Sequence, residues 1–230
     1  MAKALAISPA GLAEEDGLLV VYTDQAGAES LREAFGAVQV EPVAPGWEDE
    51  WRRFHVPVSI GPLWIGPPWH DPSPGLIPVM IEPGRAFGTG AHETTRLSIS
   101  LLLDLPRGSV LDAGCGSGVV AIAAAKAGFG PVVALDSEEA AVEATARNAA
   151  ANAVELELRR ADVLEDELPP ADIAVANLTL AAVEGFAERV DAVHLVSSGY
   201  LVGEEPRLPR FRHLERRAGE RFAADLHARK

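Results

Sequence analysis

A strand that runs into a glycine loop constrains the fold of this chain more than any other segment. Residues 110–120 read Val-Leu-Asp-Ala-Gly-Cys-Gly-Ser-Gly-Val-Val, which predicts a strand over 110–112, a tight turn and a helix over 118–127. Glycines let the backbone turn sharply and approach a ligand closely. In an open sheet of parallel strands, ligands bind in the crevice at the carboxyl ends of the strands. The segment therefore predicts a nucleotide-type cofactor site on an α/β sheet.

The chain after residue 92 alternates between strand and helix patterns. Short apolar runs predict further strands over 131–136, 156–159 and 171–177, and helices are expected over 92–103 and 181–190. A strand near 193–196 and the charged tail give weaker signals. Such alternation is typical of a mostly parallel sheet with helices on both faces. We predict a doubly wound, Rossmann-like α/β domain.

The first 80 residues have a different composition. Residues 1–45 predict a small α+β unit with a strand at 17–22, a helix at 29–35 and a strand at 38–40. Ten of the 17 prolines and all four tryptophans lie within residues 42–83. Proline blocks long helices, so we expect a stiff connector with a short helix at 47–54 and a few extended segments, packed on the main domain by its tryptophans. The predicted organisation is an N-terminal unit (1–45), a connector (46–80) and the main domain (81–230).

Charge and composition narrow the partners. The net charge of −14 disfavours phosphate backbones and suits a basic protein, so no direct nucleic-acid binding is expected. No apolar run is long enough for a membrane span, and the N-terminus lacks a signal-peptide pattern, which predicts a cytoplasmic protein. Cys115, the single cysteine, is interpreted as a packed residue and not a nucleophile. The six histidines show no metal-ligand spacing, so no metal is predicted.

The acids around the loop indicate which cofactor it binds. Asp112 precedes the first glycine of a G-x-G-x-G run, where a carboxylate would repel a pyrophosphate and favour the ammonium and sulfonium of S-adenosylmethionine. Asp136 ends the next strand, where a carboxylate can accept hydrogen bonds from ribose hydroxyls. Ser137 is expected to cap the following helix, and Asp162 could reach the adenine. An NAD-dependent oxidoreductase is the less favoured alternative.

Residues 81–97 read Ile-Glu-Pro-Gly-Arg-Ala-Phe-Gly-Thr-Gly-Ala-His-Glu-Thr-Thr-Arg-Leu. Taken alone, they predict a glycine turn and a hydroxyl-rich helix start, which could hold the amino-acid part of a ligand or be an ordinary capped helix. The run resembles the E/D-P-G-x-A-F-G-T-G-x-H-x-T-T hallmark of the ribosomal protein L11 methyltransferases. Residues 47–54 resemble the W-x-x-x-W segment of the same family, and the resemblance covers about residues 47–190.

The resemblance implies a class I S-adenosylmethionine-dependent N-methyltransferase that acts on lysine or N-terminal amino groups of ribosomal protein L11. It implies cofactor contacts from Thr95, Gly114, Asp136 and Asn177, and Asn177 is also the expected catalytic residue because it could orient the acceptor amine. The full predicted cofactor site comprises Phe87, Gly88, Thr89, Gly90, His92, Thr95, Asp112, Gly114, Gly116, Gly118, Asp136, Ser137, Asp162 and Asn177.

Three departures from the family pattern bear on the acceptor. Residues 1–45 are fewer than the family's L11-recognising domain, residues 177–183 match the family's N-[IL]-x-x-x-x-L run only loosely, and the segment after Val190 is compressed. Another protein lysine, a small molecule, or a non-catalytic cofactor-binding module therefore remain alternatives. Adenine N6-methylation is disfavoured, because the segment after Asn177 lacks the prolines and the aromatic residue that stacks a flipped base.

Overall fold

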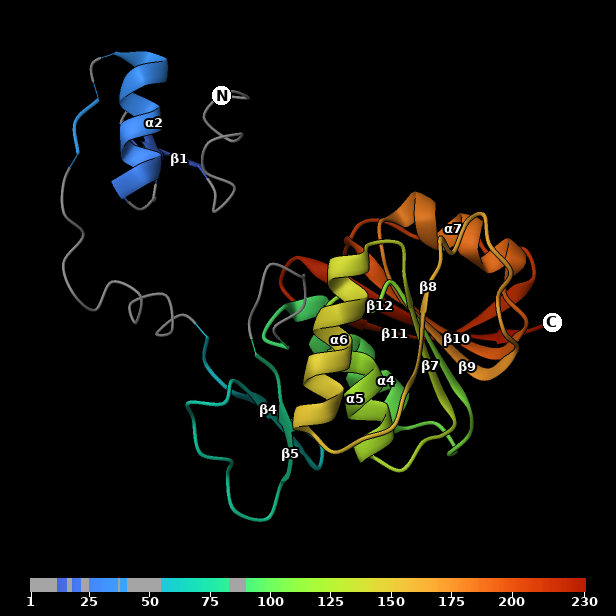
Figure 1. Ribbon diagram of the computed structural model, residues 1–230. Coiled ribbons are helices and arrows are strands. Elements are labelled where there is room, and N and C mark those ends of the chain that lie inside the picture. Colours follow the sequence, from blue (N-terminus) through green and yellow to red (C-terminus); the bar gives the residue numbers. More distant parts are fainter. Residues whose placement is uncertain (1–11, 16–17, 22–24, 37, 41–54, 83–89) are drawn as a thin grey trace. The chain divides into compact units, whose positions relative to one another are not determined.

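The computed structural model describes residues 12–15, 18–21, 25–36, 38–40, 55–82 and 90–230 (Figure 1). The chain divides into two compact units, residues 1–50 and residues 51–230, and each is described by itself. No helix within the described ranges is both long and apolar enough to cross a bilayer.

The smaller unit contains a hairpin and one helix. Strands β1 (Leu12–Glu15) and β2 (Leu18–Val21) pair antiparallel, and α2 (Gln25–Phe35) follows. The predicted strand near 17–22 and the predicted helix are confirmed. The strand predicted at 38–40 is wrong, because these residues form no regular structure. Val40 is 47% exposed, and β-propensity without burial does not make a strand.

A seven-stranded sheet forms the centre of the larger unit. Its order is β11-β12-β10-β9-β6-β7-β8. The five parallel strands are β6 (Val110–Ala113), β7 (Val132–Asp136), β8 (Glu157–Arg160), β9 (Ala171–Asn177) and β10 (Ala192–Leu201). The C-terminal hairpin of β11 (Phe211–Ala218) and β12 (Phe222–Arg229) adds antiparallel to β10.

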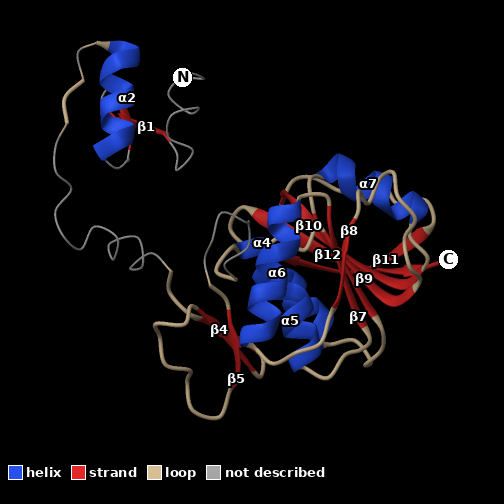
Figure 2. Ribbon diagram, viewed as in Figure 1, coloured by secondary structure: helices blue, strands red, loops and turns tan. Residues whose placement is uncertain are grey.

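Helices cover both faces of this sheet (Figure 2). α4 (Glu93–Leu103), α5 (Val119–Lys126) and α6 (Glu139–Ala151) lie on one face, and α7 (Leu180–Arg189) lies on the other. Side chains alternate along β9, where Ile173 packs with the α4–α5 core and Ala174 packs with the α7 core. Burying a large apolar side chain contributes about 1.5–3 kcal/mol, and both cores contain several, so both layers stabilise the sheet. The predicted doubly wound α/β fold is confirmed.

The proline-rich segment is more regular than the sequence predicted. Its described part forms a three-stranded sheet of β3 (Val58–Ile60), β4 (Leu63–Gly66) and β5 (Ile77–Met80). Ile65, Val79 and Ile81 are buried in the same core as α4 and α5. Residues 55–82 are thus built into the larger unit. The predicted helix at 47–54, with Trp47 and Trp51, lies outside the described residues.

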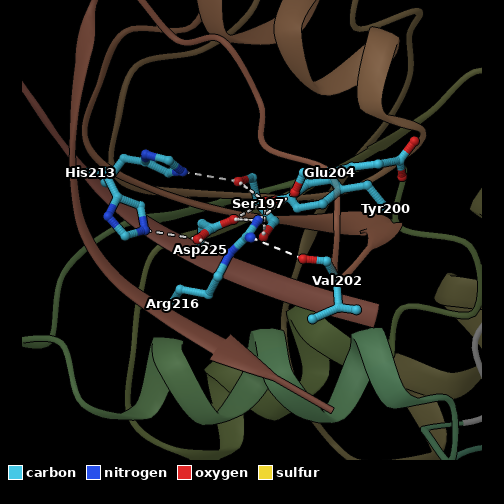
Figure 3. Close-up of polar contacts among 8 residues, drawn as sticks. Ser197, Tyr200, Val202, Glu204, His213, Arg216 and Asp225 are labelled. Atoms are coloured by element: carbon cyan, nitrogen blue, oxygen red, sulfur yellow. Dashed lines mark hydrogen bonds and ion pairs between the residues drawn. The ribbon is translucent and has the colours of Figure 1, made fainter. Parts of the chain in front are cut away.

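The charged tail, which gave only a weak signal, is the β11–β12 hairpin. A polar cluster around the buried Asp225 carboxylate joins it to β10 (Figure 3). The Asp225 carboxylate accepts hydrogen bonds from Arg216 Nε (2.9 Å) and Nη2 (3.0 Å), Tyr200 OH (2.8 Å) and His213 Nε2 (2.8 Å). Burial alone would raise the pKa of Asp225, but the hydrogen bonds outweigh it and the pKa is lowered. We call these four residues the Asp225 cluster.

Candidate cofactor and methyl-transfer site

Three neighbouring parallel strands bring the predicted site residues to one edge of the sheet. On β6, Ala113 lies beside Ala176 of β9 and Leu135 of β7. The glycine loop after β6, Asp136 at the end of β7 and Asn177 at the end of β9 therefore lie at the same carboxyl edge. This is the edge at which open α/β sheets bind ligands.

The glycine loop is fixed by the end of β7. Gly114, Gly116 and Gly118 all have positive φ angles of 75°, 55° and 81°. The N–H groups of Gly114 and Cys115 both donate to the Leu135 carbonyl at 2.9 Å. A Cβ on Gly114 would lie 2.5 Å from Leu178 Cδ2, so a larger residue would both strain the turn and displace Leu178.

Cys115 lies in the loop but points into the core. Its side chain is buried, and the Thr145 hydroxyl donates to its Sγ at 3.3 Å. Burial raises the pKa of the thiol to about 12, and the nearby Asp112 adds to the rise. A thiol with so high a pKa is a poor nucleophile. The prediction of a packed cysteine is confirmed.

Asp112 links the end of β6 to the first turn of α5, the helix that follows the glycine loop. It is 3% exposed, and its Oδ2 accepts a hydrogen bond from Ala121 N, in the first turn of α5, at 3.0 Å. Burial raises the pKa of Asp112 to about 7, and the charge of Asp136 contributes. A cation bound nearby would favour the ionised form. Direct contact between Asp112 and a cofactor stays a prediction.

Asp136 connects the loop to the start of α6. Its Oδ2 accepts from Gly116 N and its Oδ1 from Glu138 N, both at 3.0 Å. Each carboxylate oxygen has a second lone pair, which could accept a hydrogen bond from a ribose hydroxyl. The predicted capping role of Ser137 is wrong: the N-cap position is Glu138, and no side chain caps it. Asp136 already occupies the Glu138 N–H, and Ser137 is exposed.

Asp162 shapes the turn after β8. Its Oδ1 accepts from Leu164 N at 2.8 Å, while its own N–H donates to Asp166 Oδ2 at 2.8 Å. These local bonds are typical of an acid that organises a turn. Contact between Asp162 and an adenine stays a prediction.

The motif helix α4 begins next to Asn177. Phe87, Gly88 and Thr89 lie outside the described residues. Gly90 is buried, and His92 is the N-cap of α4, as the predicted helix over 92–103 requires. The His92 Nδ1 lies 2.8 Å from Thr94 Oγ1.

A polar contact joins strand β9 to α4. Asn177 Nδ2 donates to Thr95 Oγ1 at 3.4 Å, a long and therefore weak hydrogen bond, and the Thr95 side chain is buried. The structure thus joins two residues that are 82 positions apart in sequence and that the motif resemblance placed in one site.

Asn148 of α6 and Asn152, the C-cap residue of that helix, hold the chain at Met80 and Glu82, where the motif begins, and the sequence analysis missed them. Asn152 Oδ1 accepts from Met80 N at 2.8 Å, and its Nδ2 donates to Met80 O at 2.6 Å. Asn148 Oδ1 accepts from Glu82 N at 3.1 Å, and its Nδ2 donates to the Ser117 carbonyl at 2.9 Å. Asn148 was the available signal, because asparagine is unfavourable in the interior of an alanine-rich helix.

The turn after Asn177 is set by a bulge in β10. Leu178 N donates to Ser198 O at 3.0 Å, and the register of β10 against β12 shifts between Ser198 and Tyr200. Gly199 has a φ of 103°, and a Cβ there would lie 2.0 Å from the Leu178 carbonyl oxygen. Residue 199 must be glycine for the backbone of Leu178 to approach so closely.

Comparison with known proteins identifies the family. The family model described as ribosomal protein L11 methyltransferase (PrmA) matches residues 12–203. The chain belongs to this family. A ribosomal protein L11 methyltransferase of Caldanaerobacter subterraneus subsp. tengcongensis is 35% identical over 182 residues, which cover 76% of this chain and 59% of the relative. One from Vibrio cholerae serotype O1 is 41% identical over 178 residues, which cover 72% of this chain and 58% of the relative.

A solved structure of the L11 methyltransferase family supports the same assignment. The crystal structure of ribosomal protein L11 methylase from Lactobacillus delbrueckii subsp. bulgaricus superposes with a TM-score of 0.62 at 28% identity, over 74% of this chain and 95% of that chain. The family resemblance read from the motif is confirmed. The chain spans less than two thirds of the length of the two curated relatives named above. The family match also ends at residue 203, before β11 and β12.

Proposed function

We propose that this protein binds S-adenosylmethionine at the carboxyl edge of β6, β7 and β9, and transfers its methyl group to amino groups of ribosomal protein L11 in the cytoplasm. The observation that carries the proposal is the Asn177–Thr95 contact beside the glycine loop, since it joins the family's motif helix to the strand end where the acceptor is expected. The names of the relatives support L11 as the acceptor.

The chemistry of the site fits this cofactor. The Asp136 carboxylate is held by the N–H groups of Gly116 and Glu138, and its remaining lone pairs are suited to ribose hydroxyls. Asp112 is a buried acid without a cationic partner in the described part of the chain, and a positively charged ligand would complement it. When bound, S-adenosylmethionine supplies an electrophilic methyl group on a sulfonium.

The role of this protein's own residues in methyl transfer is to prepare the acceptor amine. A lysine amine has an ordinary pKa of about 10.4 and must be neutral to act as a nucleophile. Apolar surroundings favour the neutral form. The Asn177 amide donates through Nδ2 to Thr95, which leaves Oδ1 to accept a hydrogen bond from the amine and to aim its lone pair.

The test of the proposal is labelling of the acceptor. Purified L11 and whole ribosomes are incubated with the protein and isotope-labelled S-adenosylmethionine, and the products are analysed by mass spectrometry. We expect labelled amino groups on L11. Binding of the cofactor by calorimetry with no label on L11 would point to another basic protein, a small molecule or a non-catalytic module. Tight NAD binding with no response to S-adenosylmethionine would overturn the cofactor assignment as well.

Asn177→Ala separates the two roles of the asparagine. If Asn177 orients the amine, kcat should fall far more than the affinity for S-adenosylmethionine, by about 100-fold, the loss that a misplaced reactive group can cause. If it mainly binds the cofactor, affinity and rate should fall together. Thr95→Val tests the amide orientation with little change of shape. Full activity in Asn177→Ala would make the residue a turn residue only.

Residues 1–45 are proposed to dock L11 against the active site. Deleting them should abolish methylation of L11 and leave S-adenosylmethionine binding nearly unchanged, because every proposed cofactor residue lies in residues 51–230. A truncated protein that methylates L11 at the full rate would remove the docking role.

A further inference from the structure

Glu93, the first residue of α4, binds the turn of the C-terminal hairpin. Its Oε1 accepts from Glu220 N at 2.6 Å, and its Oε2 accepts from Arg221 N at 3.1 Å and Phe222 N at 2.9 Å. These three bonds join residues 127 to 129 positions apart in sequence. One carboxylate therefore satisfies three successive backbone donors, the arrangement by which backbone turns bind anions.

The turn is shaped to receive this carboxylate. Gly219 N donates to Phe222 O at 2.9 Å, which closes the turn between β11 and β12. A Cβ on Gly219 would lie 1.8 Å from Glu93 Oε1, so only glycine leaves room for the carboxylate. Next to this contact, the rings of His92 and Phe222 lie 5.1 Å apart between centroids.

The rest of α4 is tied to the same side of the sheet. Ser98 Oγ lies 2.6 Å from Ser198 Oγ in β10, next to the bulge that sets the turn after Asn177. At the far end of the helix, Asp104 forms an ion pair with Arg217 of β11. Glu93 differs from Asp104 in its position, because it lies at the end of α4 that carries His92 and Thr95.

From this geometry we infer that Glu93 is a positioning residue for methyl transfer: it holds the start of α4 on the hairpin turn, and thereby keeps Thr95 in register with Asn177. The inference rests on the proposed function. It assigns the β11–β12 hairpin, which lies outside the family match, a part in the active site. The carboxylate is ionised throughout the neutral range, since the three backbone bonds lower the pKa of Glu93.

The test compares Glu93→Gln with Asp104→Asn. Glutamine has the shape of glutamate but only one acceptor oxygen, and its NH₂ would face backbone donors. We expect Glu93→Gln to lower kcat at saturating S-adenosylmethionine about ten-fold, within the range that a shift of about 1 Å can cause, and to weaken cofactor affinity about three-fold. Asp104→Asn loses a contact between the same helix and the same hairpin, and should leave both within two-fold of the wild type.

Gly219→Ala tests the contact from its other side, because the added Cβ would displace the Glu93 carboxylate. It should reproduce the loss of kcat, and the double variant Glu93→Gln/Gly219→Ala should be no worse than either single variant. All assays are made well below each variant's Tm. A lowered Tm with unchanged kcat and cofactor affinity would make Glu93 a stabilising residue only and overturn the inference, as would equal losses in Asp104→Asn.

The wild type separates this inference from the proposed function. A wild type that binds S-adenosylmethionine but leaves L11 unlabelled would overturn the L11 assignment alone. Glu93 would then be judged by the cofactor affinities of the same variants and by amide exchange of residues 90–96. Unchanged affinity and unchanged exchange in Glu93→Gln would overturn the positioning role in that case.

Discussion

Asp112 and Asp225 are both almost fully buried, at 3% and 1% exposure, yet they are held in opposite ways. Asp225, in the antiparallel half of the sheet, accepts hydrogen bonds from a guanidinium, a phenol and an imidazole, and its pKa is lowered. Asp112, in the parallel half, accepts a hydrogen bond from the backbone N–H of Ala121, and its pKa is raised to about 7.

The difference indicates in which half of the sheet the protein itself supplies the partners of its buried acid. A buried carboxylate is stable when charged and polar partners surround it, and unstable when they do not. The Asp225 cluster supplies its own partners and joins three strands. Asp112 lies under a loop shaped for a ligand, where a cationic cofactor would supply the missing partner. The contrast therefore separates a structural acid from one at the proposed binding site.

The largest expected effect is the loss of stability when the Asp225 cluster, in the antiparallel half of the sheet, is disrupted. Asp225→Asn removes the charge that neutralises Arg216 and should lower the free energy of unfolding by about 3 kcal/mol, the lower end for a broken buried pair because Arg216 is partly exposed. Urea unfolding measures this loss. Tyr200→Phe removes one neutral donor and should cost about 1 kcal/mol. Cofactor affinity at low temperature should be unchanged in both, and a large loss of affinity in Asp225→Asn would contradict the separation of the two halves.

The next largest expected effect is the loss of cofactor binding when an acid of the proposed cofactor site is replaced. Asp136→Ala should weaken S-adenosylmethionine binding by about 1.5–3 kcal/mol, the range for hydrogen bonds to a charged group. Asp172→Ala is the matched control, because Asp172 is also a strand acid but binds Ser109 near the amino end of β6. Calorimetry should show normal affinity in the control. Equal losses of affinity in both variants would mean that cofactor binding depends on the negative charge alone and not on the position of the acid.

The last expected effect is a pH dependence of opposite sign at the two acids. The pKa of Asp112 is raised, so its favourable contribution is complete below its ordinary pKa of about 4 and is lost as the pH rises through about 7. The unfolding free energy of the wild type should therefore fall relative to that of Asp112→Asn by about 2 kcal/mol from pH 5 to pH 7. The pKa of Asp225 is lowered, so its contribution is present at neutral pH and is lost in acid. Parallel pH curves for wild type and Asp112→Asn would contradict the raised pKa.

The parallel half of this comparison could be predicted from the sequence, and the antiparallel half could not. The strands at 131–136 and 171–177 are short apolar runs that end in Asp136 and Asn177, so the place of these two residues at strand ends could be predicted. The hairpin was missed because β11 reads Phe-Arg-His-Leu-Glu-Arg-Arg-Ala, and a charged edge strand carries little apolar alternation. Partners such as Glu93 with Phe222 N depend on tertiary contacts across 129 positions, which no local pattern records.

The close approach of Gly199 to Leu178 has a practical consequence for protein engineering. The Leu178 carbonyl occupies the space where residue 199 would carry a side chain. The segments around Leu178 and Gly199 should therefore be replaced together in an engineered variant. A library made to find a new acceptor could randomise residues 177–178 alone. Such a library would keep the β10 bulge, whose shape fits the original backbone at Leu178. Grafting residues 177–178 together with 198–200 from the same donor transfers both halves of the fit.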